Sequence, residues 1–478
     1  MATTAATPAA PLNPTAPLSA TAPPTGRVQD GDASPSSRPG DARGRLGRIT
    51  VLSLGIGGLS AALFTLLGVM GGGEAAVTGG GLLGFSVGWM LLVVLSSRRT
   101  ARPQRWAAVP ATVMAAAGTG LLVIRPDDAA LTTAGWVWAP VMLALSVWSA
   151  VQARRTLTSS ARSWVVMPAL ALLALVSIGG GYQTVRVTLD ATAYPMPGRS
   201  VDVGDHALHL DCTGTGSPTV VLESGLGGAS TLWSRIVGQV SATTRVCAYD
   251  HAGQGWSESA DSPRDGLAVA ADLGTLLDRA GETGPFVLVG HSVGGPYAMT
   301  FAAERPAQVA GLVLLDETDP HHVDASVAGK GGGASGPMAL LPSLARMGLA
   351  QPFPASTWSD LPAPAADAFR AYSATARAMT NAVDEVSEYP ASFSQAQALT
   401  TLGARPLVVL TLVEKAEEDG DDYSAQQRFA RLSTNSSLRT GDTTHTGLVD
   451  DEHGSALSVV AIRDVVQAVR TGSAVAQR

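Results

Sequence analysis

Ser292 lies in a cluster of glycines, within the stretch VGHSVGG (289–295). The residues before it, PFVLVG (285–290), are typical of a buried strand, and PYAMTFAAER (296–305) is typical of a helix. A strand that turns sharply into a helix strains the backbone of the residue at the bend, and the residues two positions away on either side must lack side chains. Such a bend exposes the serine hydroxyl and directs the N–H of Val293 into the same space. The pattern therefore predicts a nucleophilic serine.

A serine hydroxyl is a weak nucleophile until a base removes its proton, so a histidine must lie within hydrogen-bond reach. The chain of 478 residues contains eight histidines that could fill this role. No group of His, Cys and acidic residues has metal-ligand spacing, so the sequence implies no metal and no organic cofactor. The formal net charge is only −7, and the arginines gather at the ends of apolar segments, which argues against a nucleic acid partner.

Strands and helices alternate around Ser292. Strands are expected at 201–212 (two strands around a Gly-Asp turn), 219–224, 243–250, 285–290, 309–316 and 405–412, with helices at 266–281 and 296–305 between them. Apolar strands that alternate with helices indicate a largely parallel sheet covered on both faces. In such a sheet the residues that follow the strands share one edge, where ligands bind.

Four stretches, in this order, resemble the α/β-hydrolase superfamily over roughly residues 197–472. They are LESGLGGASTLW (222–233), AYDHAGQGWSES (248–259), VGHSVGG (289–295) and GDTTHTGLVDDE (441–452). The nearest resemblance is to bacterial esterase-like or aminopeptidase-like members with an N-terminal membrane region. It implies a serine hydrolase that forms an acyl-enzyme with a small-molecule ester, amide or related acyl substrate. A peptidase or acyltransferase with the same triad, or a non-catalytic ligand-binding or sensor domain, is the alternative.

The resemblance also implies the roles of individual residues. The family's chain order is serine, acid, histidine, which makes His445 the base and leaves His453 on a helix surface. For the acid we favour Asp316, at the end of a buried strand, over Glu414, in the acidic run VEKAEEDGDD (413–422). One oxyanion donor is the N–H of Val293, and the other is that of Leu226 or Gly227. His291 is expected to point away from the site, and Asp250 to fix a turn.

Five apolar segments precede this region: 49–70, 77–96, 106–124, 131–151 and 164–182. Each approaches the ~20 residues that cross a bilayer as a helix, so we expect five transmembrane helices and a lipid bilayer as partner. The arginines cluster before the first segment and in the links 97–105 and 152–163, which places the N-terminus in the cytoplasm. An odd number of crossings then places the catalytic part outside the cell membrane.

These patterns predict a disordered cytoplasmic tail over 1–47, a transmembrane domain over 48–185, a linker over 186–196 and a hydrolase domain over 197–474. A helical cap is expected as an insertion at about 317–403, entered through a glycine-rich hinge (329–336). Cys212 and Cys247 both fall in the part placed outside, where a pair of cysteines is a disulfide candidate. The family's strand order puts them on neighbouring strands, which implies a bridge between them.

Overall fold

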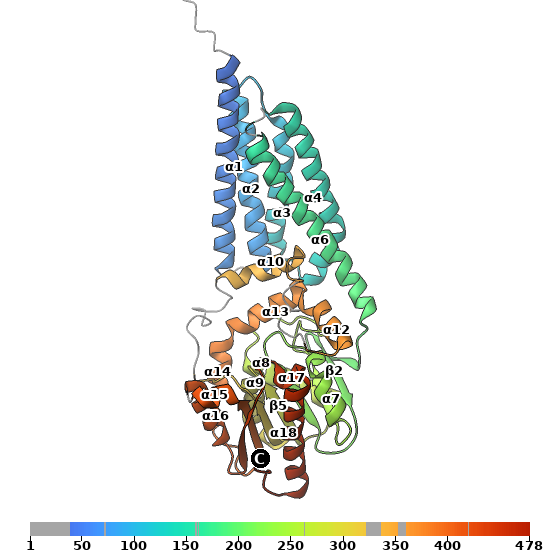
Figure 1. The fold of residues 1–478 in the computed structure, drawn as a ribbon. Helices are drawn as coiled ribbons and strands as arrows, with labels where there is room; N and C mark the ends of the chain where they lie inside the picture. The colour runs from blue at the N-terminus through green and yellow to red at the C-terminus, as the bar shows by residue number, and fades with distance from the viewer. Residues whose placement is uncertain are drawn as a thin grey trace, which may run out of the picture.

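The computed structural model describes residues 39–70, 73–157, 160, 162–261, 263–321, 336–351, 360–418 and 420–478. Within these ranges an N-terminal helical bundle stands on a C-terminal domain built around a sheet (Figure 1). Most of the tail predicted over 1–47 lies outside the described residues, and so does the hinge predicted at 329–336 except for Gly336.

All five apolar segments are helical, and each helix is long and apolar enough to cross a membrane. The helices are α1 (Pro39–Val69), α2 (Gly73–Arg99), α3 (Ala108–Ile124) with the short η1 (Arg105–Ala107) before it, α4 (Asp128–Thr156), and α6 (Met167–Ala193) preceded by η2 (Arg162–Val166). Helices α1 and α2 approach closely, because a Cβ on Gly57 would lie 2.7 Å from the Cα of Gly88. Small residues thus allow the backbones of these two helices to pack against each other.

Two helices of the bundle extend past the boundaries expected from the sequence. Helix α1 begins at Pro39, inside the segment predicted as a disordered tail, and proline suits the first turn of a helix. Helix α6 continues to Ala193 through most of the predicted linker over 186–196. No helix breaker occurs there before Pro195, and an ion pair between Arg186 and Asp190, one turn apart, supports the extension.

The C-terminal domain contains an eight-stranded sheet in the order β1-β2-β4-β3-β5-β6-β7-β8. The strands are β1 (Arg199–Asp202), β2 (Ala207–Thr213), β3 (Val220–Glu223), β4 (Val246–Tyr249), β5 (Phe286–His291), β6 (Val309–Leu315), β7 (Leu407–Leu412) and β8 (Ser436–Gly441). Strand β2 runs antiparallel to both β1 and β4, and all other neighbours are parallel. The predicted, largely parallel sheet is therefore confirmed.

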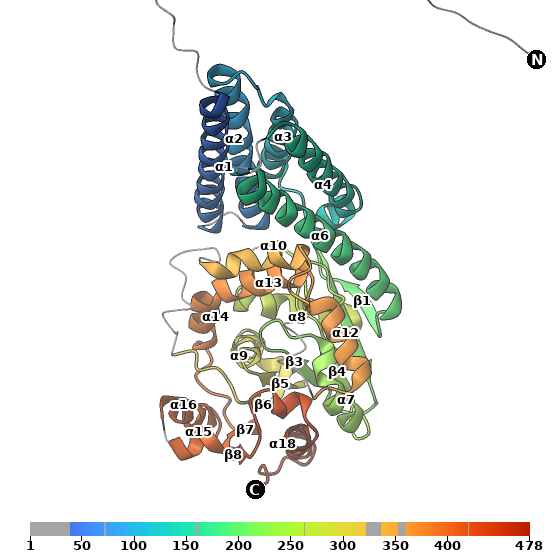
Figure 2. The same ribbon diagram turned by 45° about the horizontal axis from the view of Figure 1, so that its top comes forward.

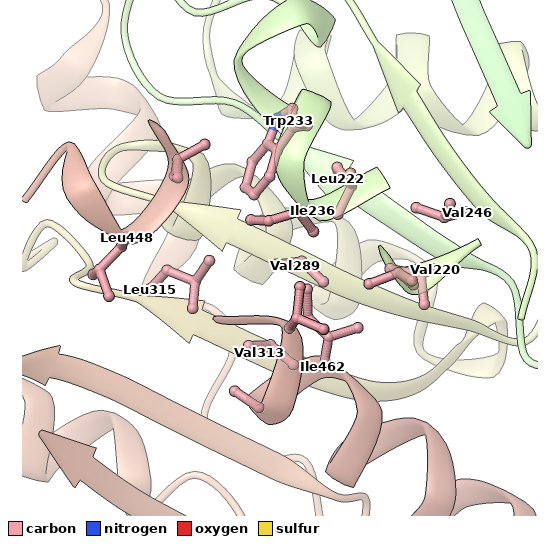
Figure 3. Close-up of a cluster of buried hydrophobic side chains, with 14 of the residues drawn as sticks. Val220, Leu222, Trp233, Ile236, Val246, Val289, Val313, Leu315, Leu448 and Ile462 are labelled. Carbon is pink, nitrogen blue, oxygen red and sulfur yellow. The ribbon is translucent and has the colours of Figure 1, made fainter. Parts of the chain in front are cut away.

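Side chains of the central strands alternate between two buried cores, one on each face of the sheet. Leu222, Val289 and Val313 pack with Trp233, α7 (Ser234–Val240) and α18 (Glu452–Thr471) on one face (Figure 3). On the other face, Val221, Leu288 and Leu312 pack with α8 (Gly266–Ala280), α9 (Gly294–Glu304) and α16 (Asp421–Ala430). Because both faces are covered, the strands consist of nearly continuous apolar residues.

Cys212 and Cys247 form a disulfide bond. They lie directly opposite each other in the antiparallel pair of β2 and β4. The bond therefore joins the antiparallel edge of the sheet to its parallel part.

The polypeptide between β6 and β7 forms helices that lie between the sheet and the bundle (Figures 1 and 2). The described ones are η5 (Pro337–Leu340), α10 (Leu341–Arg346), α12 (Ala363–Ser373), α13 (Ala376–Ser387) and α14 (Tyr389–Ala396). We call these helices the cap. Helix α14 packs on α8 and α9, whereas α10 packs on α13 and contacts α2 and α6 of the bundle.

Candidate active site

The chain bends sharply at Ser292, between the end of β5 and the start of α9. Ser292 has a φ of 58°, in the left-handed region that L-residues with a side chain rarely adopt. A Cβ on Gly290 would lie 2.6 Å from the Cα of Gly295, and one on Gly294 would lie 2.4 Å from the carbonyl oxygen of Glu223. The glycines at both positions are therefore required by close backbone approaches, as the sequence pattern predicts.

The carboxylate of Asp316 lies beside the imidazole of His445 at the same edge of the sheet. Asp316 follows β6, His445 lies in the turn after β8, and Nδ1 of His445 is 2.6 Å from Oδ2 of Asp316. The hydroxyl of Thr411 donates to Oδ1 of Asp316 at 2.9 Å, and Nζ of Lys415 lies 3.0 Å from the carboxylate. Asp316 is 1% exposed, whereas the imidazole is 42% exposed and can be reached from solvent.

These contacts keep Asp316 ionised at neutral pH. Burial alone would raise the pKa of its carboxyl, but the hydrogen bond from His445 and the charge of Lys415 lower it below its usual value. An ionised Asp316 accepts the Nδ1–H of His445, which fixes the tautomer in which Nε2 is unprotonated. The free Nε2 is the atom that a general base needs.

The other candidates for acid and base lie elsewhere. Glu414, the alternative acid, is exposed on α15 (Val413–Glu418), and its side chain makes no hydrogen bond to His445 in the described part of the chain. His453 is exposed near the start of α18. Of these candidates, only Asp316 and His445 are brought together by the structure.

His291 does not point away from this site, contrary to expectation. Its Nε2–H donates to the backbone carbonyl oxygen of His445 at 2.9 Å, and the two imidazole rings are 4.6 Å apart. Burial, followed by the charge of His445, lowers the pKa of His291 to about 3, so it stays neutral at physiological pH. His291 therefore positions the loop that carries His445, a role that its place beside Ser292 in the sequence does not reveal.

The residues expected to form an oxyanion hole lie around Ser292. A turn closed by the bond from Gly228 N–H to the Gly225 carbonyl carries Leu226 and Gly227, and a Cβ on Gly225 would lie 3.0 Å from the Cβ of Ser292. The N–H groups of Leu226, Gly227 and Val293 have no hydrogen-bond acceptor among the described residues. Unoccupied backbone donors next to a nucleophile are what an oxyanion hole requires.

Comparisons with known proteins agree with this fold. Residues 218–329 match the family model described as the alpha/beta hydrolase fold. The C-terminal domain has the α/β-hydrolase fold. A putative carbamate hydrolase, RutD, from Azorhizobium caulinodans is 34% identical over 24% of this chain and 42% of its own length. An uncharacterized protein, YbdG, from Bacillus subtilis is 28% identical over 32% of this chain and 47% of its own length.

The chain thus spans less than half the length of these curated relatives. Among solved structures, a putative ancestral haloalkane dehalogenase superposes with a TM-score of 0.47 and 19% identity, over 57% of this chain and 99% of its own. RutD is named as a hydrolase and YbdG is of unspecified function, so neither name specifies a substrate for this chain.

A small pocket is lined by Gly227 of the oxyanion loop, as we call residues 224–229 after β3, by Trp256 of the loop after β4, and by Phe369 and Tyr372 of the cap helix α12. Asp250 holds the loop after β4, as expected for a structural residue, because its carboxylate accepts from the N–H groups of Ser230 and Trp256 at 2.6 and 2.9 Å. The lining combines these aromatic side chains with polar ones.

Proposed function

We propose that this protein is a serine hydrolase that cleaves an ester, amide or related acyl compound. The bond between Nδ1 of His445 and Oδ2 of Asp316, at the sheet edge that also holds the strained Ser292, supports this proposal most directly. Hydrolase-named relatives support the broader class.

In the first half of the reaction, Oγ of Ser292 attacks the acyl carbon while Nε2 of His445 takes the hydroxyl proton. Asp316 stabilises the resulting imidazolium through the Nδ1–H bond. The negative charge on the substrate oxygen is stabilised by the N–H of Val293 and by that of Leu226 or Gly227, each worth roughly 3–4 kcal/mol of the barrier. The imidazolium then donates its proton to the leaving group, which departs and leaves an acyl-serine.

In the second half, His445 takes a proton from water and the resulting hydroxide attacks the acyl-serine. The tetrahedral intermediate uses the same oxyanion donors, and collapses with transfer of the proton from His445 back to Oγ of Ser292. The carboxylic acid is released and the free enzyme is restored. An acceptor other than water in this step would make the protein an acyltransferase.

A fluorophosphonate probe tests this proposal, because it reacts with activated serines. We expect the wild-type chain to be labelled, and Ser292→Ala to lose the label while its melting temperature is unchanged. Ser241→Ala, at the end of α7, is the control and should label like the wild type. Folded wild-type protein that takes up no label would indicate a binding domain, and label that survives in Ser292→Ala would indicate another nucleophile.

We also propose that the bundle spans a membrane, with the N-terminus in the cytoplasm and the hydrolase domain outside. Large apolar side chains cover its outer surface, among them Leu59, Leu67 and Leu175, which are 73%, 58% and 66% exposed. A soluble protein rarely exposes so large an apolar patch. The arginine clusters lie at the end of the bundle remote from the hydrolase domain, and the disulfide suits an oxidising compartment.

Single cysteines introduced on the two proposed sides of the membrane test this topology. We expect a membrane-impermeant maleimide to label Gln477→Cys in intact cells, because Gln477 lies near the end of the hydrolase domain, and to label Thr100→Cys, after α2, only once the membrane is broken. The opposite pattern would place the hydrolase domain in the cytoplasm. Equal labelling of both sites in intact cells would mean that the bundle does not span the membrane.

A further inference from the structure

A buried histidine outside the proposed triad, His251, joins the sheet to the cap. Its Nδ1 lies 3.2 Å from Oε1 of Glu385 on α13, and its Nε2 contacts Oε1 of Glu223 at the end of β3. The hydroxyl of Tyr249 donates to the other oxygen of Glu223 at 2.6 Å. All these side chains are buried, so the contacts are shielded from water.

A protonated imidazole suits this arrangement, because it can donate a hydrogen bond from each ring nitrogen to the carboxyl oxygen beside it. Burial would lower the pKa of His251, but Glu223 and then Glu385 raise it to about 10. Removing one partner of such a buried group leaves the others uncompensated, so the three residues act as a unit.

Both ends of this unit lie next to the proposed oxyanion hole. Glu223 is the last residue of β3 and immediately precedes the oxyanion loop. Ala382, on α13 three residues before Glu385, is the nearest neighbour of a Cβ built on Gly227, at 3.9 Å. Residues three apart share one face of a helix, so the face of α13 that His251 holds is the one that covers the oxyanion loop.

We propose that His251 is a positioning residue that holds α13 over the oxyanion loop and thereby keeps the N–H groups of Leu226 and Gly227 aimed at the substrate oxygen. The proposal rests on the proposed serine hydrolase function. It predicts an effect on the chemical step rather than on folding alone, because the donors act on charge that develops only during reaction.

His251→Gln tests this in the full chain in detergent micelles, with p-nitrophenyl acetate as substrate. His206→Gln is the matched control, because His206 is also buried between two carboxylates, 2.7 Å from Asp205 and 3.2 Å from Asp272. His206 holds neither β3, which leads into the oxyanion loop, nor the cap. We expect His251→Gln to lower kcat by about 10–100-fold with little change in KM, since loss of a whole oxyanion donor costs roughly 10²–10³. His206→Gln should keep kcat within about threefold.

Glu385→Gln completes a double-mutant cycle and serves if His251→Gln does not fold, since it leaves the contact with Glu223 in place. The two changes together should cost little more in kcat than His251→Gln alone. Equal losses of kcat in His251→Gln and His206→Gln, or fully additive losses in the cycle, would overturn the proposal. Failure of the proposed function would show differently, as wild-type activity that persists in Ser292→Ala.

A second cluster, independent of the first, joins the cap to the bundle. Arg346, at the end of α10, contacts both carboxylate oxygens of Glu74 on α2, donating to one of them at 2.9 Å, and donates to Asp128 on α4 at 2.8 Å. Glu74 is the acidic residue at the start of an otherwise apolar helix. The hydroxyls of Thr78 and Ser343 are also hydrogen-bonded across this interface, at 2.9 Å.

The bundle also contacts the cap through the backbone of α6. A Cβ on Gly179 would lie 2.2 Å from the carbonyl oxygen of Met347, so only glycine allows α10 to approach this closely. The amide of Gln183 donates to the carbonyl of Ala374, between α12 and α13, at 3.2 Å. Helix α10 in turn packs against α13 through a buried cluster that includes Ala345 and Ala376.

We infer that the bundle supports the cap structurally. Arg346 positions the cap helices by fixing α10 to the end of the bundle that faces the C-terminal domain. A bidentate guanidinium between two carboxylates is a geometry that lysine cannot reproduce. The bundle then determines where Phe369 and Tyr372 of α12 lie, and both line the pocket beside Gly227.

Arg346→Gln in the full chain, reconstituted in lipid nanodiscs, tests this inference. Arg370→Gln is the matched control, because Arg370 lies in the same cap but, among the residues that the structure describes, pairs with Asp367 on its own helix alone, at the surface. We expect Arg346→Gln to speed amide hydrogen exchange in α13 about tenfold and to raise KM for p-nitrophenyl butyrate about fivefold or more, whereas Arg370→Gln changes neither by more than twofold.

Arg346→Lys carries the test if the glutamine variant does not fold, and should give an intermediate exchange rate. Exchange in α13 that is the same in Arg346→Gln and Arg370→Gln would overturn the inference. The exchange measurement needs no turnover, so its outcome does not depend on the proposed function.

Discussion

Replacement of Asp316 by asparagine should disable the base while leaving the fold in place. The carboxylate accepts from Nδ1 of His445, from Thr411 and from Lys415. An asparagine amide at this position would donate to Nδ1 instead of accepting from it, so the proton would move to Nε2, where it blocks uptake of the Ser292 proton. Loss of the correct tautomer in a triad costs about 10⁴-fold, which is roughly 5 kcal/mol of the barrier.

Lys415 adds a second reason to expect a large effect of Asp316→Asn. Its ammonium lies 3.0 Å from the carboxylate, so neutralisation of Asp316 leaves a cation next to the imidazole and disfavours its protonated form. We therefore expect kcat/KM for p-nitrophenyl acetate to fall by about 10³–10⁴-fold. Glu414→Gln, at the exposed alternative acid, should stay within about twofold. A folded Asp316→Asn that keeps more than about a tenth of the activity, with Glu414→Gln nearly inactive, would refute this assignment.

Three further predictions concern the framework around the site. Glu317 is buried, and burial raises the pKa of its carboxyl. The wild type therefore loses stability as the pH rises above the pKa that this carboxyl has in the unfolded chain. Between pH 5 and pH 8 the unfolding free energy of Glu317→Gln, measured by urea denaturation, should rise relative to that of the wild type by more than about 1 kcal/mol. Reduction of the disulfide, whose cysteines are 35 residues apart, should lower the unfolding free energy by roughly 3–4 kcal/mol, and a thiol reagent should find both cysteines blocked in unreduced protein. Gly294→Ala should abolish fluorophosphonate labelling, because its Cβ would lie 2.4 Å from the Glu223 carbonyl oxygen, whereas Gly238→Ala, in open space on α7, should keep full labelling and not be destabilised.

The sheet and its sharp bend could be predicted from sequence because both depend on local patterns. Runs of apolar β-formers mark the strands, and the glycines around Ser292 reflect backbone approaches within a few residues. The resemblance to the family supplied the strand order that implied the disulfide, and Cys212 does lie opposite Cys247. Asp316 ends a buried strand, and the parallel sheet brings it to the edge that His445 reaches after β8.

Contacts between distant segments could not be predicted in the same way. Lys415 meets Asp316 across 99 residues, and Arg346 meets Glu74 across 272. Nothing in the sequence around Lys415 or around Arg346 distinguishes these residues from charged side chains on a solvated surface. The partner of His251 on the cap, Glu385, likewise lies on an amphipathic helix whose docking face is set only by tertiary packing.

Helix α6 connects the two parts of the chain as one unbroken rod, from Met167 to Ala193. Its 27 residues rise about 40 Å, whereas the hydrocarbon layer of a bilayer is about 30 Å thick, so in the proposed membrane topology its last turns would project beyond the lipid. Tyr194, the residue that follows, accepts hydrogen bonds from Trp256 and Tyr372. If the bundle spans the membrane as proposed, a rigid helix of this length holds the C-terminal domain at a fixed distance from the bilayer surface. Such a placement would favour substrates that are themselves bound to the membrane.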